Sequence, residues 1–160
     1  MQSLRNQSTQ KAIFAGLALI FATSFAVMTM AAERWITKTS PHSVEVTADR
    51  LVAAIENGPP TLFARIDHAA GAKSAGLELT PSTVVLFGNP KLGTPIMQAA
   101  PKAALDLPMR ILIWSQDGQT MMGALSPQAL KDRYSIQGAD KQFEVMNGAI
   151  NGLMEAAAKP

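Results

Sequence analysis

The stretch from Arg65 to Pro108 restricts the fold of this chain most, because short apolar runs in it end at sharp corners. Residues 82–87 form a run rich in β-branched side chains, which is typical of a strand covered on at least one face. Gly88-Asn89-Pro90 breaks that run. Thr94-Pro95 then matches a helix start, with threonine as the N-cap and proline at the first helical position. This part of the chain predicts a buried strand that turns sharply and leads into a helix.

Further elements are predicted upstream of that strand. Residues 61–68 alternate between two faces, as a strand does. Asp67 is placed to cap a short helix over residues 69–75, because its carboxylate can accept backbone N–H groups of the first turn. Earlier still, alternation of apolar and polar residues predicts a first strand that ends near Val46. Thr47 is the expected N-cap of the helix that follows that strand.

The last third of the chain predicts a hairpin and a long helix. Residues 109–116 and 119–125 fit two strands joined by Asp117-Gly118, which favours a type I′ turn because both positions need a positive φ. An apolar stripe at helical spacing predicts a C-terminal helix that begins near Asp140. Strands and helices mix without regular alternation. The fold class that follows is α+β, with a single mostly antiparallel sheet and short inserted helices.

The start of the chain differs from the rest. Two basic residues precede a run without charge at residues 12–30, and the small residues Ala31 and Ala32 follow. This order predicts a signal peptide over residues 1–31 and a single α+β domain over residues 32–160. The alternative is an uncleaved N-terminal anchor, because the apolar run comes close to the about 20 residues that span a bilayer. Under either interpretation the domain is exported: periplasmic or extracellular, or anchored to the cytoplasmic membrane and facing the periplasm.

Composition excludes several classes of protein. Hydrophobic residues make up 48% of the 160-residue chain, which is enough apolar material for a packed core. The chain has 14 basic and 12 acidic residues and no basic stripe, which argues against nucleic-acid binding. Because it has no cysteine, it can form no disulfide, thiolate nucleophile or cysteine-ligated metal site.

Several short blocks of residues follow one another in an order typical of one family. The blocks are Ile66-Asp67-His68-Ala69-Ala70, Gly76-Leu77-Glu78-Leu79, Pro81, Phe87-Gly88-Asn89-Pro90, Gly93-Thr94-Pro95 and Leu107-Pro108. They resemble the family named domain of unknown function 302, over roughly Val44 to Tyr134. The resemblance implies a β-α-β4-α arrangement similar to the TATA-box-binding-protein fold, usually paired as a homodimer. It implies no DNA binding and no firmly assigned activity, because a fold does not fix a function.

Six residues are predicted to meet in one concave site. They are Asp67, His68, Gly88, Asn89, Lys91 and Thr94. If the two strands that precede these corners end at the same edge of one sheet, the corners are neighbours. Free N–H groups at the helix start and the charge of Lys91 then suit a small anionic or amide-bearing ligand. The alternative is a tight turn followed by a helix cap, with no ligand.

Asp67-His68 also permits a catalytic hypothesis. A hydrolase or isomerase with His68 as general base and Asp67 nearby is the alternative function. Adjacent residues on a strand point to opposite faces, however, and Asp67 has a sufficient role as a helix cap. A metal site needs at least three ligands, and His42 is the only other histidine. We therefore expect no metal and no cofactor.

The sequence as a whole predicts an exported protein that binds a small ligand or a partner, without demonstrated catalysis. A structural interaction module of the cell envelope is a further alternative. Trp114 and Met121 are expected to be cross-strand neighbours on the face opposite Ile111 and Ile113. Because a small sheet with one covered face leaves apolar residues for a partner, we expect a symmetric homodimer.

Overall fold

A five-stranded sheet is the scaffold of the structure, a computed structural model that describes residues 35–160. The strands are β1 (Trp35–Ser40), β2 (Thr61–Asp67), β3 (Ser82–Gly88), β4 (Met109–Gln116) and β5 (Gln119–Leu125). They lie in the order β1-β5-β4-β3-β2, and every neighbouring pair is antiparallel. The predicted α+β class with an antiparallel sheet is confirmed. The predicted signal peptide or anchor at residues 1–31 lies outside the described residues.

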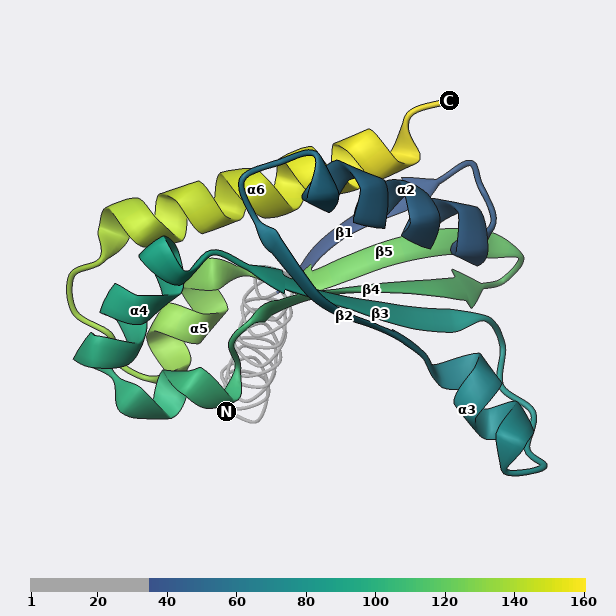
Figure 1. The fold of residues 1–160 in the computed structure, drawn as a ribbon, viewed down its shortest axis with the longest axis horizontal. Coiled ribbons are helices and arrows are strands. Elements are labelled where there is room, and N and C mark those ends of the chain that lie inside the picture. Colours follow the sequence, from purple (N-terminus) through teal and green to yellow (C-terminus); the bar gives the residue numbers. More distant parts are fainter. Residues whose placement is uncertain (1–34) are drawn as a thin grey trace, which may run out of the picture. The chain divides into compact units, whose positions relative to one another are not determined.

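The helices are α2 (Val44–Glu56), α3 (His68–Ser74), α4 (Pro90–Ala99), the 3-10 helix η1 (Pro101–Leu105), α5 (Pro127–Arg133) and α6 (Asp140–Ala158). Helices α2 and α6 cover one face of this sheet (Figure 1). Helix α3 lies beyond one end of the strands, and α4 and α5 lie beyond the other end. The helices α2 and α6 pack against each other and against the sheet. Within residues 35–160, no helix is long and apolar enough to cross a bilayer.

The main core lies between this helix pair and the sheet. It includes Leu51 and Ile55 of α2, Phe87 of β3 and Ile150 of α6, all essentially inaccessible to solvent. The predicted apolar stripe of the C-terminal helix is buried along its length, and the helix begins at Asp140 as expected. A second cluster packs α4 and α5 against the first half of α6.

The turn residues Asp117 and Gly118 determine the geometry of the β4–β5 hairpin. Asp117 and Gly118 have φ values of 51° and 78°, as a type I′ turn requires. The turn sets the register, so that Trp114 pairs with Met121 and Ile113 with Met122. The predicted hairpin and its register are confirmed.

The start of α2 was predicted wrongly. The first strand ends at Ser40, and the helix begins at Val44 with Ser43 as its N-cap, where the Ser43 hydroxyl accepts the Val46 N–H at 3.2 Å. Thr47 lies inside the helix, fully buried, and its hydroxyl forms a hydrogen bond of 2.8 Å with the Ser40 hydroxyl. Residues 44 and 46 fit both a strand and a helix, and burial of the helical face decides between them.

The start of α4 was also predicted wrongly. Asn89 is the N-cap, its side-chain oxygen accepts the Lys91 N–H at 2.9 Å, and Pro90 occupies the first helical position. Thr94 and Pro95 therefore lie inside the helix, where the missing N–H of Pro95 removes one backbone hydrogen bond. The same pair of signals, a capping side chain before proline, occurs at both places, and the first one starts the helix.

The face of the sheet opposite α2 and α6 is largely uncovered by the described elements. Trp35 is 50% exposed and Ile66 is 44% exposed on this face. A Cβ atom added at Gly123 would lie 3.0 Å from the Trp114 ring and 3.5 Å from the Trp35 ring, so glycine lets both indoles pack over the sheet. The homodimer expected through this face stays a prediction.

Candidate functional site

The six residues predicted to form one site divide between two ends of the sheet. Because β2 and β3 are antiparallel, Thr61 pairs with Gly88 and Asp67 pairs with Thr83. Asp67 and His68 therefore lie about 17 Å along the strand direction from Gly88. The prediction of one concave site containing all six residues is wrong.

At the first end, Asp67 acts as a helix cap. Its carboxylate accepts the Ala70 N–H at 2.9 Å, which confirms the predicted capping role. His68 is the exposed first residue of α3 and lies on the wall of a cavity of about 350 Å³ on the uncovered sheet face. Within residues 35–160, no three acidic or histidine side chains come together as a metal site.

At the other end, a larger cavity of about 770 Å³ opens between α2, α4 and α6. Gly88, Asn89, Lys91 and Thr94 line it, so four of the six predicted residues share one site. The remaining lining residues come from α2, the turn after it, β2, α4, the segment before β4 and α6: Ala54, Gly58, Pro59, Pro60, Phe63, Pro90, Leu92, Gly93, Met97, Leu107, Pro108, Met109, Val145, Met146, Ala149, Gly152 and Leu153.

The lining of this cavity is apolar almost throughout. Among the described residues 35–160, Asn89, Lys91 and Thr94 carry the only polar side chains of its wall, and no acidic residue or histidine lines it. Cavities of this size and character hold small molecules through apolar contact, with a few polar groups that fix orientation. The wall thus combines a mostly apolar surface with Asn89, Lys91 and Thr94. The expected small anionic or amide-bearing ligand stays a prediction.

Local backbone features shape the rim of the cavity. The pairing of β2 with β3 shifts between Leu62 and Ala64, so Phe63 is the extra residue of a bulge, and this residue is 56% exposed. A Cβ atom at Gly88 would lie 3.5 Å from the Phe63 ring and 3.4 Å from Cβ of Pro108. Val145 of α6, which also lines the cavity, is 45% exposed. Two exposed apolar side chains thus border the cavity.

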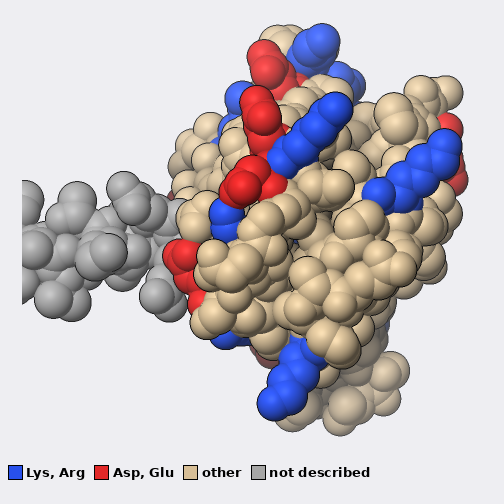
Figure 2. Space-filling model, turned by 90° about the vertical axis from the view of Figure 1, so that its left-hand side faces the viewer, with Lys and Arg blue, Asp and Glu red and all other residues tan. Residues whose placement is uncertain are grey.

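Charged groups lie mainly at the margins of this end of the molecule. Figure 2 shows an uncharged centre with basic and acidic side chains around it. The one charged residue of the cavity wall is Lys91, which is exposed and takes part in none of the ion pairs found within residues 35–160.

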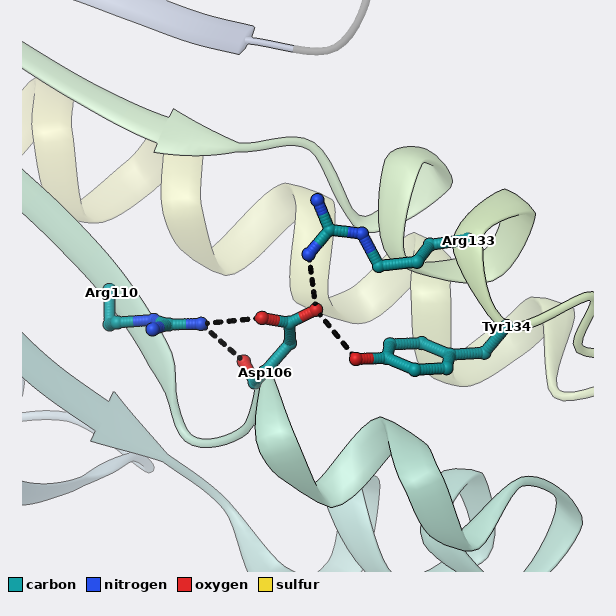
Figure 3. Close-up of polar contacts among 4 residues, drawn as sticks. All are labelled: Asp106, Arg110, Arg133 and Tyr134. Carbon is teal, nitrogen blue, oxygen red and sulfur yellow. Dashed lines mark hydrogen bonds and ion pairs between the residues drawn. The ribbon is translucent and has the colours of Figure 1, made fainter.

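A polar cluster beside the cavity fixes one part of its wall (Figure 3). Asp106 accepts hydrogen bonds from Arg110 Nη2 at 2.9 Å, Arg133 Nη1 at 2.7 Å and the Tyr134 hydroxyl at 2.9 Å. Burial alone would raise the pKa of the Asp106 carboxyl, but the hydrogen bonds from Arg133, Tyr134 and Arg110 outweigh burial and lower this pKa. The cluster ties the segment 106–110, which includes wall residues 107–109, to α5.

Sequence reasoning missed the apolar wall of the cavity. Two sequence features could have indicated this wall, since both lie in it: the turn Gly58-Pro59-Pro60 and the glycine Gly152 of α6. Gly148 and Gly152 both have open space where a Cβ atom would lie. Of the two, Gly152 lines the cavity.

Comparison with known proteins gives partial matches to three curated relatives. They are the fluoride-specific ion channels FluC 1 of Brucella suis biovar 1 (strain 1330), FluC 1 of Brucella abortus biovar 1 (strain 9-941) and FluC 2 of Brucella melitensis biotype 1. Each is 40% identical over 102 residues, or 63% of this chain. The match covers 40% of the first relative and 38% of the other two, so the chain spans about two fifths of their length.

A solved structure and a family comparison agree on the fold. The crystal structure of an uncharacterized conserved DUF302 protein from Bacillus stearothermophilus matches with a TM-score of 0.69 at 14% identity, covering 77% of this chain and 97% of that protein. The family described as domain of unknown function DUF302 matches residues 36–153, most of the described chain. The chain therefore belongs to the DUF302 family.

Proposed function

We propose that this domain is a binding module that holds a small apolar molecule in the cavity between α2, α4 and α6. The observation that carries the proposal is a cavity of about 770 Å³ whose wall is apolar except at three side chains. Burying apolar ligand surface yields about 25 cal/mol per Å², so such a wall favours an apolar guest. The volume lies within the range found for ligand sites.

Binding is favoured over catalysis by the residues of the wall. General acid–base chemistry needs a titratable group within hydrogen-bond reach of the reacting atom. In the part of the chain that the structure describes, no histidine and no acidic residue belongs to the wall, and Asp67 and His68 lie at the other end of the sheet. The cavity therefore supplies apolar contact and a few hydrogen bonds, which suits recognition of a ligand.

Access to the cavity is proposed to lie between Phe63 and Val145. Both side chains line the cavity and are about half exposed. Large apolar side chains left in water at the edge of a cavity are typical of ligand-binding sites. A ligand that covers them removes further apolar surface from water, which adds to its affinity.

The place where the domain works is proposed to be next to a membrane. The apolar run at residues 12–30 leads an exported domain to the outer side of the cytoplasmic membrane. The relatives whose sequences match part of this chain are named as ion channels, which reside in membranes.

The intact mass of the protein isolated from its host is expected to correspond to a chain that begins at Ala32 or Glu33. A mass that includes residues 1–31 would instead indicate an anchor.

A substitution that fills the cavity tests the proposed function. N-phenyl-1-naphthylamine is an uncharged apolar probe whose fluorescence rises in an apolar site. We expect the purified protein, in detergent-free buffer, to enhance this fluorescence saturably. Gly152→Leu places a side chain into the cavity and is expected to weaken binding by about tenfold or more, because the added carbons occupy the ligand volume.

Gly148→Leu provides a matched control. Gly148 lies on the same helix, is equally open and does not line the cavity. Both substitutions are expected to stabilise α6 by up to about 1 kcal/mol, since glycine is a poor helix former. Equal probe binding by the two variants, or no saturable binding by the unmodified protein, would contradict the proposed function.

A further inference from the structure

The three polar side chains of the cavity wall come from one short stretch of chain at the start of α4. Asn89 is the N-cap of α4, and Lys91 and Thr94 belong to the first five residues of that helix. The walls formed by α2, β2, the segment 107–109 and α6 carry apolar side chains or glycine only. The cavity is therefore amphipathic, with one polar corner and a long apolar remainder.

This corner offers more donors than acceptors. The side-chain oxygen of Asn89 already accepts the Lys91 N–H at 2.9 Å, which leaves two amide N–H donors and one acceptor position on this side chain. Lys91 contributes an ammonium group with three N–H donors, and Thr94 a hydroxyl that donates or accepts. A ligand group that complements this set must be rich in acceptors and negatively charged.

The charge of the corner is not balanced by the cavity itself. No aspartate or glutamate lines the wall, and none of the ion pairs found within residues 35–160 includes Lys91. An anionic group bound there would pair with Lys91 without displacing an existing partner. Next to an apolar wall, such a pair is stronger than one fully surrounded by water.

We infer that the ligand is a single-chain acidic amphiphile, whose apolar chain fills the cavity and whose anionic head lies against Asn89, Lys91 and Thr94. This inference rests on the proposed function, since it needs the cavity to bind an apolar molecule. It specifies the ligand class: a free carboxylate or a phosphate monoester at the end of an aliphatic chain. The head group, and not the chain, is what Lys91 distinguishes.

Displacement of the bound probe by amphiphiles of equal chain length tests the inference. Dodecanoate, dodecyl phosphate, dodecanol and dodecyltrimethylammonium are compared below their micelle-forming concentrations. We expect at least one of the two anions to bind about fivefold more tightly than dodecanol, the amount that a partly exposed ion pair contributes. The cation is expected to bind most weakly. The preference for the anion should decrease as salt is added, because ions screen the pair.

Lys91→Met isolates the contribution of the anionic head group to the binding affinity, because methionine keeps a long apolar side chain without the charge. The variant is expected to lose its preference for the anions, measured as the ratio of the anion affinity to the dodecanol affinity of the same protein. Lys102→Met serves as the control, since Lys102 is an exposed lysine of η1 that does not line the cavity. Whether the carboxylate or the phosphate is preferred identifies which head group the corner selects.

The outcomes separate this inference from the proposed function. If the neutral probe and dodecanol bind but the anions gain nothing and Lys91→Met has no effect, the acidic head group is wrong and the apolar site stands. If the neutral probe does not bind, the proposed function fails first. An equal loss of anion preference in Lys91→Met and Lys102→Met would show a general charge effect and would also overturn the assignment to Lys91.

Discussion

Replacing Phe87 with alanine is expected to lower the free energy of unfolding by about 3–5 kcal/mol, because the ring is removed from a closed core. Phe87 lies on β3 within the cluster that packs the sheet against α2 and α6, and solvent does not reach it. For a domain of this size the loss corresponds to a thermal unfolding midpoint lower by about 10 °C or more. Urea titration followed by circular dichroism measures the change in the free energy of unfolding.

Leu86→Ala provides the matched control for this change. Leu86 is the preceding residue of the same strand, points to the uncovered face and is only partly buried. Its truncation is expected to cost about 1 kcal/mol, since fewer contacts are lost and no closed cavity forms. A loss as large as that of Phe87→Ala would contradict burial on one face only and would indicate that the second face is covered in solution.

Asp106→Asn is expected to lower the free energy of unfolding by about 1–3 kcal/mol at neutral pH, because charged hydrogen bonds are replaced by weaker ones. The carboxylate is 15% exposed and accepts from Arg110, Arg133 and Tyr134. The substitution should also loosen the segment 107–109, which forms part of the cavity wall. Chemical denaturation at several pH values measures the difference between the two proteins.

The pH dependence follows from the lowered pKa of Asp106. A carboxyl whose pKa is lower in the folded than in the unfolded state stabilises the fold fully above its ordinary pKa of 3.8. That stabilisation disappears as the pH falls through the lower, folded-state pKa. The unmodified protein and Asp106→Asn should therefore differ at pH 7 and converge in strong acid. Asp132→Asn, an exposed change on α5, is the control and should have little effect at any pH.

Elements with strong local signals were predictable from the sequence. The turn at Asp117-Gly118, the cap at Asp67 and the apolar stripe of α6 each fix a structure through neighbours within a few residues. The starts of α2 and α4 were not, because two capping residues compete within four or five positions in each case. Which of the two residues caps the helix depends on the face that the helix buries against the sheet, and that contact joins residues far apart in the sequence.

The site was predictable only in part, because the local sequence does not determine whether two strands pair parallel or antiparallel. The connection between β2 and β3 contains the helix α3, and a helical crossover usually joins parallel strands. Here the strands are antiparallel, so Asp67 and His68 end up far from Asn89. The apolar wall was missed for another reason: its residues come from distant segments, and from sequence they cannot be told from core residues.

The two tryptophans of the chain, Trp35 and Trp114, both lie over Gly123 on the uncovered sheet face. Neither lines the larger cavity. Intrinsic fluorescence is thus a reporter of that single surface: its emission should shift when another macromolecule covers the sheet and stay constant while a ligand fills the cavity. One sample can therefore be read in two independent optical channels, with the indoles following association and an added dye following ligand occupancy.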